Sequence, residues 1–328
     1  MKILVLGAAG MVGRKLVAAL AAAGQVGGRA ISALTLADVI EPSAPDTDIA
    51  HRLVAVDLSA RGAAEQLIAD RPDLIFHLAA IVSGEAEADF EKGYRINLDG
   101  TRQLFEAIRL AGQAAPYCPR LVFTSSIAVF GEPLPAVIGD QHEHTPLTSY
   151  GTQKAIGELL LADYSRRGIF DGIGIRLPTI AVRPGKPNKA ASGFFSGIIR
   201  EPLNGLEAVL PVDDSVRHWF ASPRAAVGFL LHAAAMDTAR LGNQRNLSMP
   251  GLAVTVAEQI AALERVAGPK AVALIRRAPD AIVADIVAGW PKAFEPRRAR
   301  ALGFAGDASF DEIIRIYIAD ELDGRIAV

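Results

Sequence analysis

A tyrosine and a lysine lie four residues apart in the run Tyr150-Gly-Thr-Gln-Lys154. Residues at this spacing share one helix face, which places the Lys154 ammonium beside the Tyr150 phenol. A free tyrosine titrates near ~10, but a cation about 4 Å away at an effective dielectric of about 20 contributes roughly 4 kcal/mol. That energy corresponds to about three pKa units. The pair therefore predicts a general base that works near neutral pH; a solvated helix face with the same spacing is the common alternative.

A hydroxyl group that could orient a substrate lies upstream of this pair. Thr124-Ser125-Ser126 ends an apolar run, which is typical of a buried parallel strand. The side chains at the end of such a strand are available to a ligand.

The elements that must position these groups begin at the N-terminus. Residues 2–6 form a short apolar run, and Gly7-Ala-Ala-Gly10-Met-Val-Gly13 follows directly, before an alanine-rich stretch that predicts a helix over 14–23. A strand, a glycine loop and a helix in this order open a dinucleotide-binding unit, with the pyrophosphate on the helix N-terminus. The loop residues predicted to contact the cofactor are Gly7, Gly10, Met11, Val12 and Gly13.

Acidic residues follow the next two predicted strands. Asp38 ends the strand predicted at 34–38, where a carboxylate suits the ribose 2′-hydroxyl of NAD and repels the 2′-phosphate of NADP. Arg52 nearby leaves NADP as the alternative. Asp57, after a third strand, is expected at the adenine edge, with a strand-end cap as the alternative. NAD is thus the predicted cofactor.

A fourth strand, predicted at 73–77, runs into a loop of small residues. Ala79 and Ala80 in this loop would let the backbone approach the cofactor closely. His77 could act as an acid or base, but on an apolar strand we expect a histidine of the core with its polar atoms satisfied.

Composition excludes several other classes of protein. The formal charge is −2 over 328 residues with both signs interspersed, so no basic stripe predicts a nucleic-acid partner. Cys118 is the one cysteine, which excludes an internal disulfide, favours a reducing compartment and, without a Cys/His cluster, argues against a metal site. No apolar run is long enough for a membrane span, and the N-terminus does not resemble a signal peptide. We therefore expect a cytoplasmic protein.

The order of predicted elements gives the fold class. Up to residue 177, apolar strands alternate with helical patterns, notably at 94–112 and 149–167, which predicts an α/β fold with a Rossmann-type doubly wound parallel sheet. Prolines between 178 and 211 are expected to interrupt regular structure and to cover the active site. Residues 1–177 form the predicted NAD-binding domain, to which 213–248 return. Residues 178–328 form mainly a smaller, discontinuous C-terminal α/β substrate lobe, with helices near 257–267, 279–288 and 310–320.

With these motifs placed, the chain resembles the extended short-chain dehydrogenase/reductase (NAD-dependent epimerase/dehydratase) family over essentially its whole length. The resemblance implies that Tyr150 is the general base, that Lys154 stabilises the phenolate and binds the nicotinamide ribose, and that Ser126 orients the reacting hydroxyl. Asn97 would structure the middle helix, a plain helix N-cap being the alternative. The further cofactor contacts it implies are Asp57, Leu58, Leu78, Ala79, Ala80, Asn97, Ser125 and Pro178.

Departures from the family pattern narrow the expected reaction. Ile127 and Ala128 stand where dehydratase members carry an Asp-Glu pair, so dehydration of a sugar nucleotide is not expected. The runs 147–158, 176–188 and 196–203 resemble dehydrogenases that oxidise the C2 hydroxyl of a four-carbon sugar acid with NAD. An NAD-dependent sugar-acid dehydrogenase is therefore predicted. A nucleotide-sugar epimerase or reductase and a non-catalytic dinucleotide-sensing protein are the alternatives.

A small sugar-acid substrate needs a cation for its carboxylate, and arginine is the best bidentate partner. The candidate cations are Arg183, Lys186 and Arg217, and the candidate hydroxyl partners are Ser83, Thr179 and Asn188, beside Ser126 and Tyr150. The family resemblance also implies a homodimer through the helices at 94–112 and 149–167.

Overall fold

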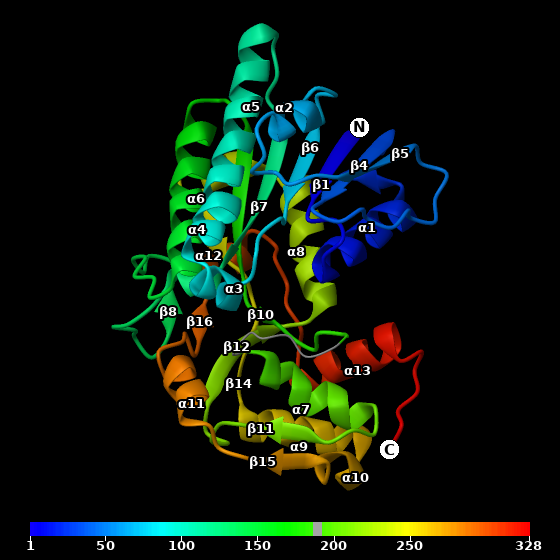
Figure 1. Ribbon diagram of the computed structural model, residues 1–328, viewed down its shortest axis with the longest axis vertical. Helices are drawn as coiled ribbons and strands as arrows, with labels where there is room; N and C mark the ends of the chain where they lie inside the picture. The colour runs from blue at the N-terminus through cyan, green and yellow to red at the C-terminus, as the bar shows by residue number, and fades with distance from the viewer. Residues whose placement is uncertain (186–191) are drawn as a thin grey trace. The chain divides into compact units, whose positions relative to one another are not determined.

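The computed structural model describes residues 1–185 and 192–328 (Figure 1). The chain folds as two compact units, each built from separate segments. Unit 1 consists of Met1–Val129, Pro146–Arg176 and Val227–Leu247, and unit 2 of Phe130–Thr145, Leu177–Ala226 and Ser248–Val328. Residues 227–247 thus lie in unit 1, whereas 213–226 and also 130–145 lie in unit 2, and the assignment of cofactor and substrate roles to the two predicted domains stays a prediction.

Unit 1 contains a seven-stranded sheet in the order β13-β9-β7-β6-β1-β4-β5. Its pairs β1–β4, β4–β5, β1–β6 and β6–β7 are parallel, and the strand order reverses between β1 and β6. This is the predicted Rossmann-type topology, in which ligands bind beyond the carboxyl ends of the strands at the reversal. The strands span Lys2–Leu6 (β1), Ala33–Asp38 (β4), His51–Ala55 (β5), Leu74–His77 (β6), Arg120–Ser126 (β7), Asp171–Leu177 (β9) and Asn246–Ser248 (β13).

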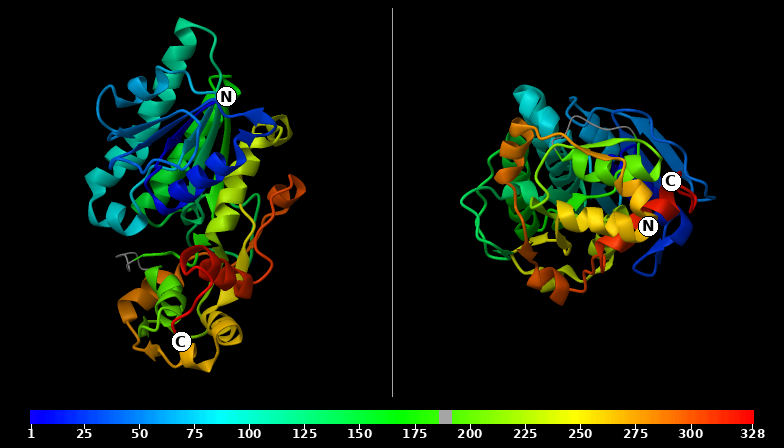
Figure 2. Two further views of the ribbon diagram at one scale, coloured as in Figure 1. Left: turned by 90° about the vertical axis from the view of Figure 1, so that its right-hand side faces the viewer. Right: turned by 90° about the horizontal axis from the view of Figure 1, so that it is seen from below.

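Helices cover both faces of this sheet, as the turned view in Figure 2 shows. Helix α5 packs against α2 and α6, and Leu104, Phe105 and Ile108 of α5 are fully buried with Phe123 of β7 and Phe170. The predicted helix at 94–112 begins with a π-helical segment, η1. The helices span Met11–Ala23 (α1), Ala63–Ile68 (α2), Ser83–Ala88 (α3), Phe90–Gly93 (α4), Tyr94–Asp99 (η1), Gly100–Ala114 (α5), Ser149–Arg166 (α6) and Pro223–Ala235 (α8).

Unit 2 has its own core between a small mixed sheet and three helices. Strand β12 pairs in parallel with β10 and antiparallel with β14. Helix α9 starts with a capping box of Thr255 and Glu258, and it packs on α7 and α13. The main elements span Thr179–Ile180 (β10), Arg217–Ala221 (β12), Leu252–Thr255 (β14), Gly193–Leu203 (α7), Val256–Ala267 (α9), Ala281–Ala288 (α11) and Phe310–Glu321 (α13).

The expectation that prolines interrupt regular structure from 178 to 211 was wrong for α7 and for β11 (Ala208–Leu210). Phe195, Ile198, Ile199 and Leu203 recur at helical spacing on α7 and are all fully buried in unit 2. Pro202 lies in the last turn, so the hydrogen bond that it removes is at the end of the helix and not at its centre. Burial of this apolar face therefore outweighs the local proline signal.

Within residues 1–185 and 192–328, no helix is both long and apolar enough to span a membrane.

Candidate active site

The glycine loop after β1 is shaped by two close backbone approaches. Gly7 has a φ of 87°, and a Cβ there would lie 2.7 Å from the Ala79 nitrogen. A Cβ on Gly13 would lie 2.0 Å from the Gly7 carbonyl oxygen. Because both positions exclude a side chain, α1 packs directly on the loop, and the loop meets the segment after β6. The cap residue Gly10 offers no side-chain acceptor, so the predicted cofactor residues Gly7, Gly10, Met11, Val12 and Gly13 form a cradle that fits a pyrophosphate.

Asp38 lies beside this loop at the end of β4. Its Oδ2 accepts a hydrogen bond from the Ala9 amide at 2.9 Å, and Oδ1 accepts from the Val39 amide at 2.7 Å. Each carboxylate oxygen has a further lone pair for a ribose hydroxyl. Arg52, which left NADP open, instead forms an ion pair with Asp70 at 2.8 Å. The local charge at the loop therefore favours NAD.

Asp57 makes the strand-end contacts of the alternative interpretation. Its Oδ1 accepts from the amide and hydroxyl of Ser59 at 2.9 and 2.6 Å, and Oδ2 accepts from Arg95 at 2.8 Å. Burial alone would raise the pKa of Asp57, but these hydrogen bonds outweigh it and hold the pKa below its usual value. The neighbouring Leu58 is buried, and the adenine contacts predicted for both residues stay predictions.

Asn97 connects the loop after β6 with helix α6. Its Oδ1 accepts from the Ile81 amide at 2.9 Å, while its Nδ2 donates to Gln153 at 2.7 Å. Asn97 thus fixes the loop that contains Leu78, Ala79 and Ala80, and these contacts differ from a helix N-cap. Ser83 follows this loop as the first residue of α3.

His77 is a core histidine, as expected, but its polar atoms are not all satisfied, because Nδ1 is buried without a hydrogen-bond partner among the described residues. Thr101 donates its hydroxyl hydrogen to the Asn97 carbonyl at 2.7 Å, so it accepts from His77 Nε2 at 2.9 Å. His77 is 1% exposed, and burial, with a smaller contribution from Lys154, lowers its pKa to about 3. The ring is therefore neutral near pH 7.

Tyr150 and Ser126 are brought to neighbouring segments of unit 1. Helix α6 is capped by Thr148, whose hydroxyl accepts from the Gly151 amide at 3.0 Å. A Cβ on Gly151 would lie 2.1 Å from the Ala128 carbonyl oxygen, so the first turn of α6 packs directly on the turn after β7. In that turn, Ser126 Oγ accepts from the Ala128 amide at 3.1 Å. The packing at Gly151 thus holds Tyr150 close to the segment that carries Ser126.

Lys154 is buried beneath Tyr150, with 3% of its surface exposed. Its Nζ donates to the Thr124 carbonyl at 2.8 Å and lies 5.7 Å from the centroid of the Tyr150 ring. Burial lowers the pKa of Lys154 to about 8, against an opposing effect of the Glu158 charge. The spacing of Tyr150 and Lys154 is therefore not that of a solvated helix face, since a charged amine is held in the interior against the end of β7.

Two further charged residues lie behind this pair and were missed in the sequence. Ser125 donates its hydroxyl to Glu158 Oε1 at 2.5 Å, and Arg176 forms an ion pair with Glu158 Oε2 at 2.7 Å. The contact predicted between Ser125 and the nicotinamide stays a prediction. The available signal was the position of Glu158 on the face of Lys154, one turn further along the helix.

Thr179, predicted as a substrate contact, is fixed by a histidine of unit 2. His218 Nδ1 donates to the Pro291 carbonyl at 2.9 Å, which leaves Nε2 to accept from the Thr179 hydroxyl at 2.6 Å. Burial lowers the pKa of His218 to about 4, so this arrangement persists near pH 7. The Thr179 oxygen is consequently left as an acceptor for another group. Pro178 directly precedes it.

The candidate carboxylate ligands differ in their surroundings. Arg183 is partly buried, and its Nε donates to the Ile180 carbonyl at 3.1 Å. Arg217 is exposed and lies 3.7 Å from Glu258, as expected of a surface ion pair. Lys186 and Asn188 lie outside the described residues. Among those described, no group of three or more His, Cys, Asp or Glu side chains could hold a metal ion.

Comparison with known proteins decides the family. Residues 3–246 match the model of the NAD dependent epimerase/dehydratase family. The chain belongs to this family. It is an NAD-dependent oxidoreductase with NAD as its cofactor. The contacts of NAD with the glycine loop and Asp38 stay predictions.

Three relatives that are similar over nearly their full length have two different descriptions, a D-erythronate dehydrogenase and a nucleoside-diphosphate-sugar epimerase. The chain is 50% identical to a D-erythronate dehydrogenase of Cupriavidus necator over 98% of both chains. It is 41% identical to a D-erythronate dehydrogenase of Haemophilus influenzae, over 97% of this chain and 99% of the relative. A crystal structure described as a nucleoside-diphosphate-sugar epimerase from Agrobacterium tumefaciens is 64% identical, with a TM-score of 0.97 and coverage of 99% of this chain and 95% of that one.

Proposed function

We propose that the protein oxidises the C2 hydroxyl of a small sugar acid with NAD, converting D-erythronate to 2-oxo-D-erythronate. The observation that carries the proposal is the buried Lys154 beside Tyr150, in a chain that is alike over nearly its full length to two D-erythronate dehydrogenases. Ile127 and Ala128 follow Ser126 and supply no acid–base pair for dehydration.

In the proposed reaction, Tyr150 as phenolate takes the proton of the C2 hydroxyl while Ser126 donates a hydrogen bond to the same oxygen. Lys154 balances the charge on Tyr150. Bound NAD supplies the acceptor for the hydride that leaves C2, so that a carbonyl forms. Arg183 or Arg217 holds the substrate carboxylate.

The remaining substrate hydroxyls would form hydrogen bonds with Thr179 and Ser83. The Thr179 oxygen accepts, because its hydrogen is committed to His218. Ser83 can donate or accept. A substrate hydroxyl that meets Thr179 must therefore act as the donor.

A nucleotide-sugar epimerase is the second candidate, because the 64% identical Agrobacterium structure is described as one. An epimerase recycles its NAD within one turnover and retains it, whereas a dehydrogenase exchanges NAD at each turnover. Cofactor retention therefore distinguishes the two candidates.

We also propose a cytoplasmic homodimer that associates through α5 and α6. Leu110 of α5 and Leu159 of α6 are 47% and 66% exposed on two helices that contact each other, and such an association would bury them. Replacing Leu159 with Lys should convert a dimer to a monomer in light scattering. An unchanged mass would refute this interface.

The deciding experiment measures NADH formation by the purified protein with D-erythronate, D-threonate, L-threonate or a UDP-sugar. A rate with D-erythronate that exceeds those with the other acids supports the proposal. Conversion of the UDP-sugar, with NAD retained through purification and no oxidation of any acid, would replace it with the epimerase.

A further inference from the structure

A buried carboxylate lies one helical turn beyond Lys154 on α6. Glu158 is 0% exposed and Arg176 of β9 is 7% exposed. Arg176 Nε donates to Glu158 Oε1 at 2.9 Å, and Arg176 Nη2 donates to Glu158 Oε2 at 2.7 Å. Such a bidentate pair has a fixed geometry, and the cost of desolvating two charges means that stability alone does not explain it.

Glu158 also reaches the strand that carries the proposed catalytic hydroxyl. Ser125 donates to Glu158 Oε1 at 2.5 Å. The residue before Ser125 is Thr124, whose carbonyl accepts from Lys154, and the residue after it is Ser126. The contact at Ser125 therefore fixes the backbone on both sides, at the acceptor for Lys154 and at Ser126.

The charged and titratable groups around Lys154 come from three elements. Tyr150 and Glu158 lie one turn before and one turn after it on α6, His77 interacts with it from β6, and Arg176 of β9 is held on Glu158. His77 is neutral near pH 7 because its pKa is lowered. Glu158 is thus the anion among these groups, apart from Tyr150 itself when it is ionised.

Building on the proposed function, we propose that Glu158 is a positioning residue of this reaction centre, with two separable effects. Its charge keeps Lys154 in the ammonium form over the working pH range. Its hydrogen bond to Ser125 holds the end of β7 so that Thr124 and Ser126 stay in place. Arg176 fixes the carboxylate for both effects.

The charge effect is tested with Glu158→Gln, which keeps an acceptor for Ser125 but removes the negative charge. The alkaline arm of the kcat/KM profile should move to lower pH by about one unit. At a fixed pH on that arm, kcat/KM should therefore fall about tenfold. Affinity for NAD should change little. The double variant Glu158→Gln/Arg176→Met removes the uncompensated cation and should restore stability, but the displaced alkaline arm should persist. A wild-type profile in the double variant would overturn the charge effect.

The positioning effect is tested with Ser125→Ala, which removes the hydrogen bond between Ser125 and Glu158 and leaves the charge of Glu158 in place. We expect a lower kcat with an unchanged pH profile. An unchanged kcat would overturn this part of the proposal.

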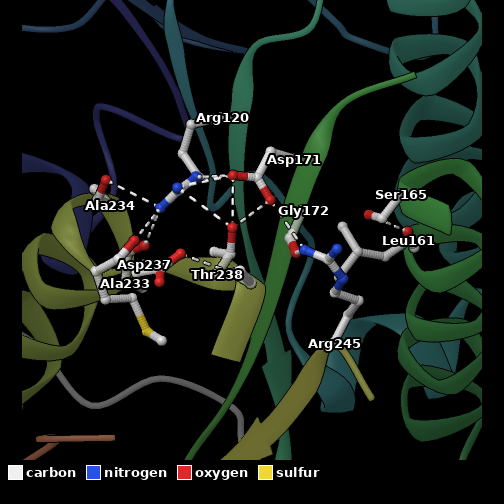
Figure 3. Close-up of polar contacts among 12 residues, drawn as sticks. Arg120, Leu161, Ser165, Asp171, Gly172, Ala233, Ala234, Asp237, Thr238 and Arg245 are labelled. Atoms are coloured by element: carbon white, nitrogen blue, oxygen red, sulfur yellow. Dashed lines mark hydrogen bonds and ion pairs between the residues drawn. The ribbon is translucent and has the colours of Figure 1, made fainter. Parts of the chain in front are cut away.

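A matched control lies at the opposite ends of the same two strands (Figure 3). Arg120 begins β7 and Asp171 begins β9, and they form an ion pair at 2.8 Å to which Thr238 and Arg245 add contacts at 2.6 and 2.9 Å. Asp171→Asn should lower thermal stability and leave the pH profile unchanged. A profile displaced as in Glu158→Gln would show that any broken ion pair in the sheet has this effect, which would overturn the proposal.

A readout without substrate separates this proposal from the proposed function. The phenolate absorbance of Tyr150 is obtained as the difference between each protein and the same protein with Tyr150→Phe. In Glu158→Gln the titration of Tyr150 should move to higher pH, even if no sugar acid is oxidised. An unmoved titration would overturn the charge effect whatever the substrate.

Discussion

Replacing Lys154 with Met should stabilise the fold while abolishing turnover. Burial lowers the pKa of Lys154 from 10.5 to about 8, and each pKa unit corresponds to about 1.4 kcal/mol. The buried ammonium therefore costs roughly 3 kcal/mol at pH 7. Loss of the hydrogen bond to the Thr124 carbonyl costs about 1–3 kcal/mol. A net stabilisation of about 1 kcal/mol is expected, since Met keeps an apolar chain in the same space.

The pH dependence gives the sharper test. Because the pKa of Lys154 is lower in the folded protein than in the unfolded chain, the unfolded chain binds more protons between about pH 8 and 10.5. Wild-type stability therefore gains from this group as the pH rises through that interval. The free energy of unfolding of the Met variant lacks this increase. The amount by which it exceeds that of the wild type should therefore be smaller near pH 9 than near pH 7.

Urea unfolding of both proteins, followed by far-ultraviolet circular dichroism, measures this difference. Tyr164, whose pKa is raised to about 12, and Tyr117 and Tyr317, whose pKa values are also raised, lower the stability at higher pH in both proteins and cancel in the comparison. A variant that is less stable at pH 7, or a difference that does not vary with pH, would refute the assignment of a destabilising buried ammonium.

Three further substitutions test the candidate site. Tyr150→Phe should lower kcat by about 10²–10⁴-fold with NAD affinity retained in a fluorescence titration; substantial turnover would remove Tyr150 from the role of base. Gly13→Ala places a Cβ 2.0 Å from the Gly7 carbonyl oxygen, so we expect a loss of about 1–3 kcal/mol of stability and weaker NAD binding, and normal binding would contradict the close packing. Asp38→Asn keeps an acceptor for the Ala9 amide but removes the charge that repels a 2′-phosphate, so the kcat/KM preference for NAD over NADP should fall about tenfold; an unchanged preference would contradict that role.

The sequence predicts the Rossmann-type sheet well because its signals are local. The apolar run at 2–6 and the spacing of Gly7 and Gly13 depend on neighbours along the chain, and the sterics at these glycines are visible in the pattern itself. Helix α7 was missed because Pro202 was given more weight than the apolar spacing of residues 195–203. That helix depends on burial in unit 2, which no local pattern measures.

The polar contacts of the candidate site were harder to predict, because they join distant segments. Glu158 and Arg176 are eighteen residues apart, and His218 and Thr179 thirty-nine. A sequence gives the types of these side chains but not their burial or their partners. The chain shows Lys154 four residues after Tyr150, whereas the carboxylate that faces Lys154 becomes evident only when α6 packs against β7 and β9.

The interleaving of the two units constrains how the protein can be made. On the ribosome, residues 1–176 emerge first, but β9 still lacks its outer partner β13, and Arg120 still lacks the carbonyls of Ala233, Ala234 and Met236 (Figure 3). An unpaired strand edge of this kind favours association with other chains. Unit 1 is therefore completed only after the intervening segments of unit 2 have been synthesised, and no uninterrupted fragment of the chain consists of unit 1 alone.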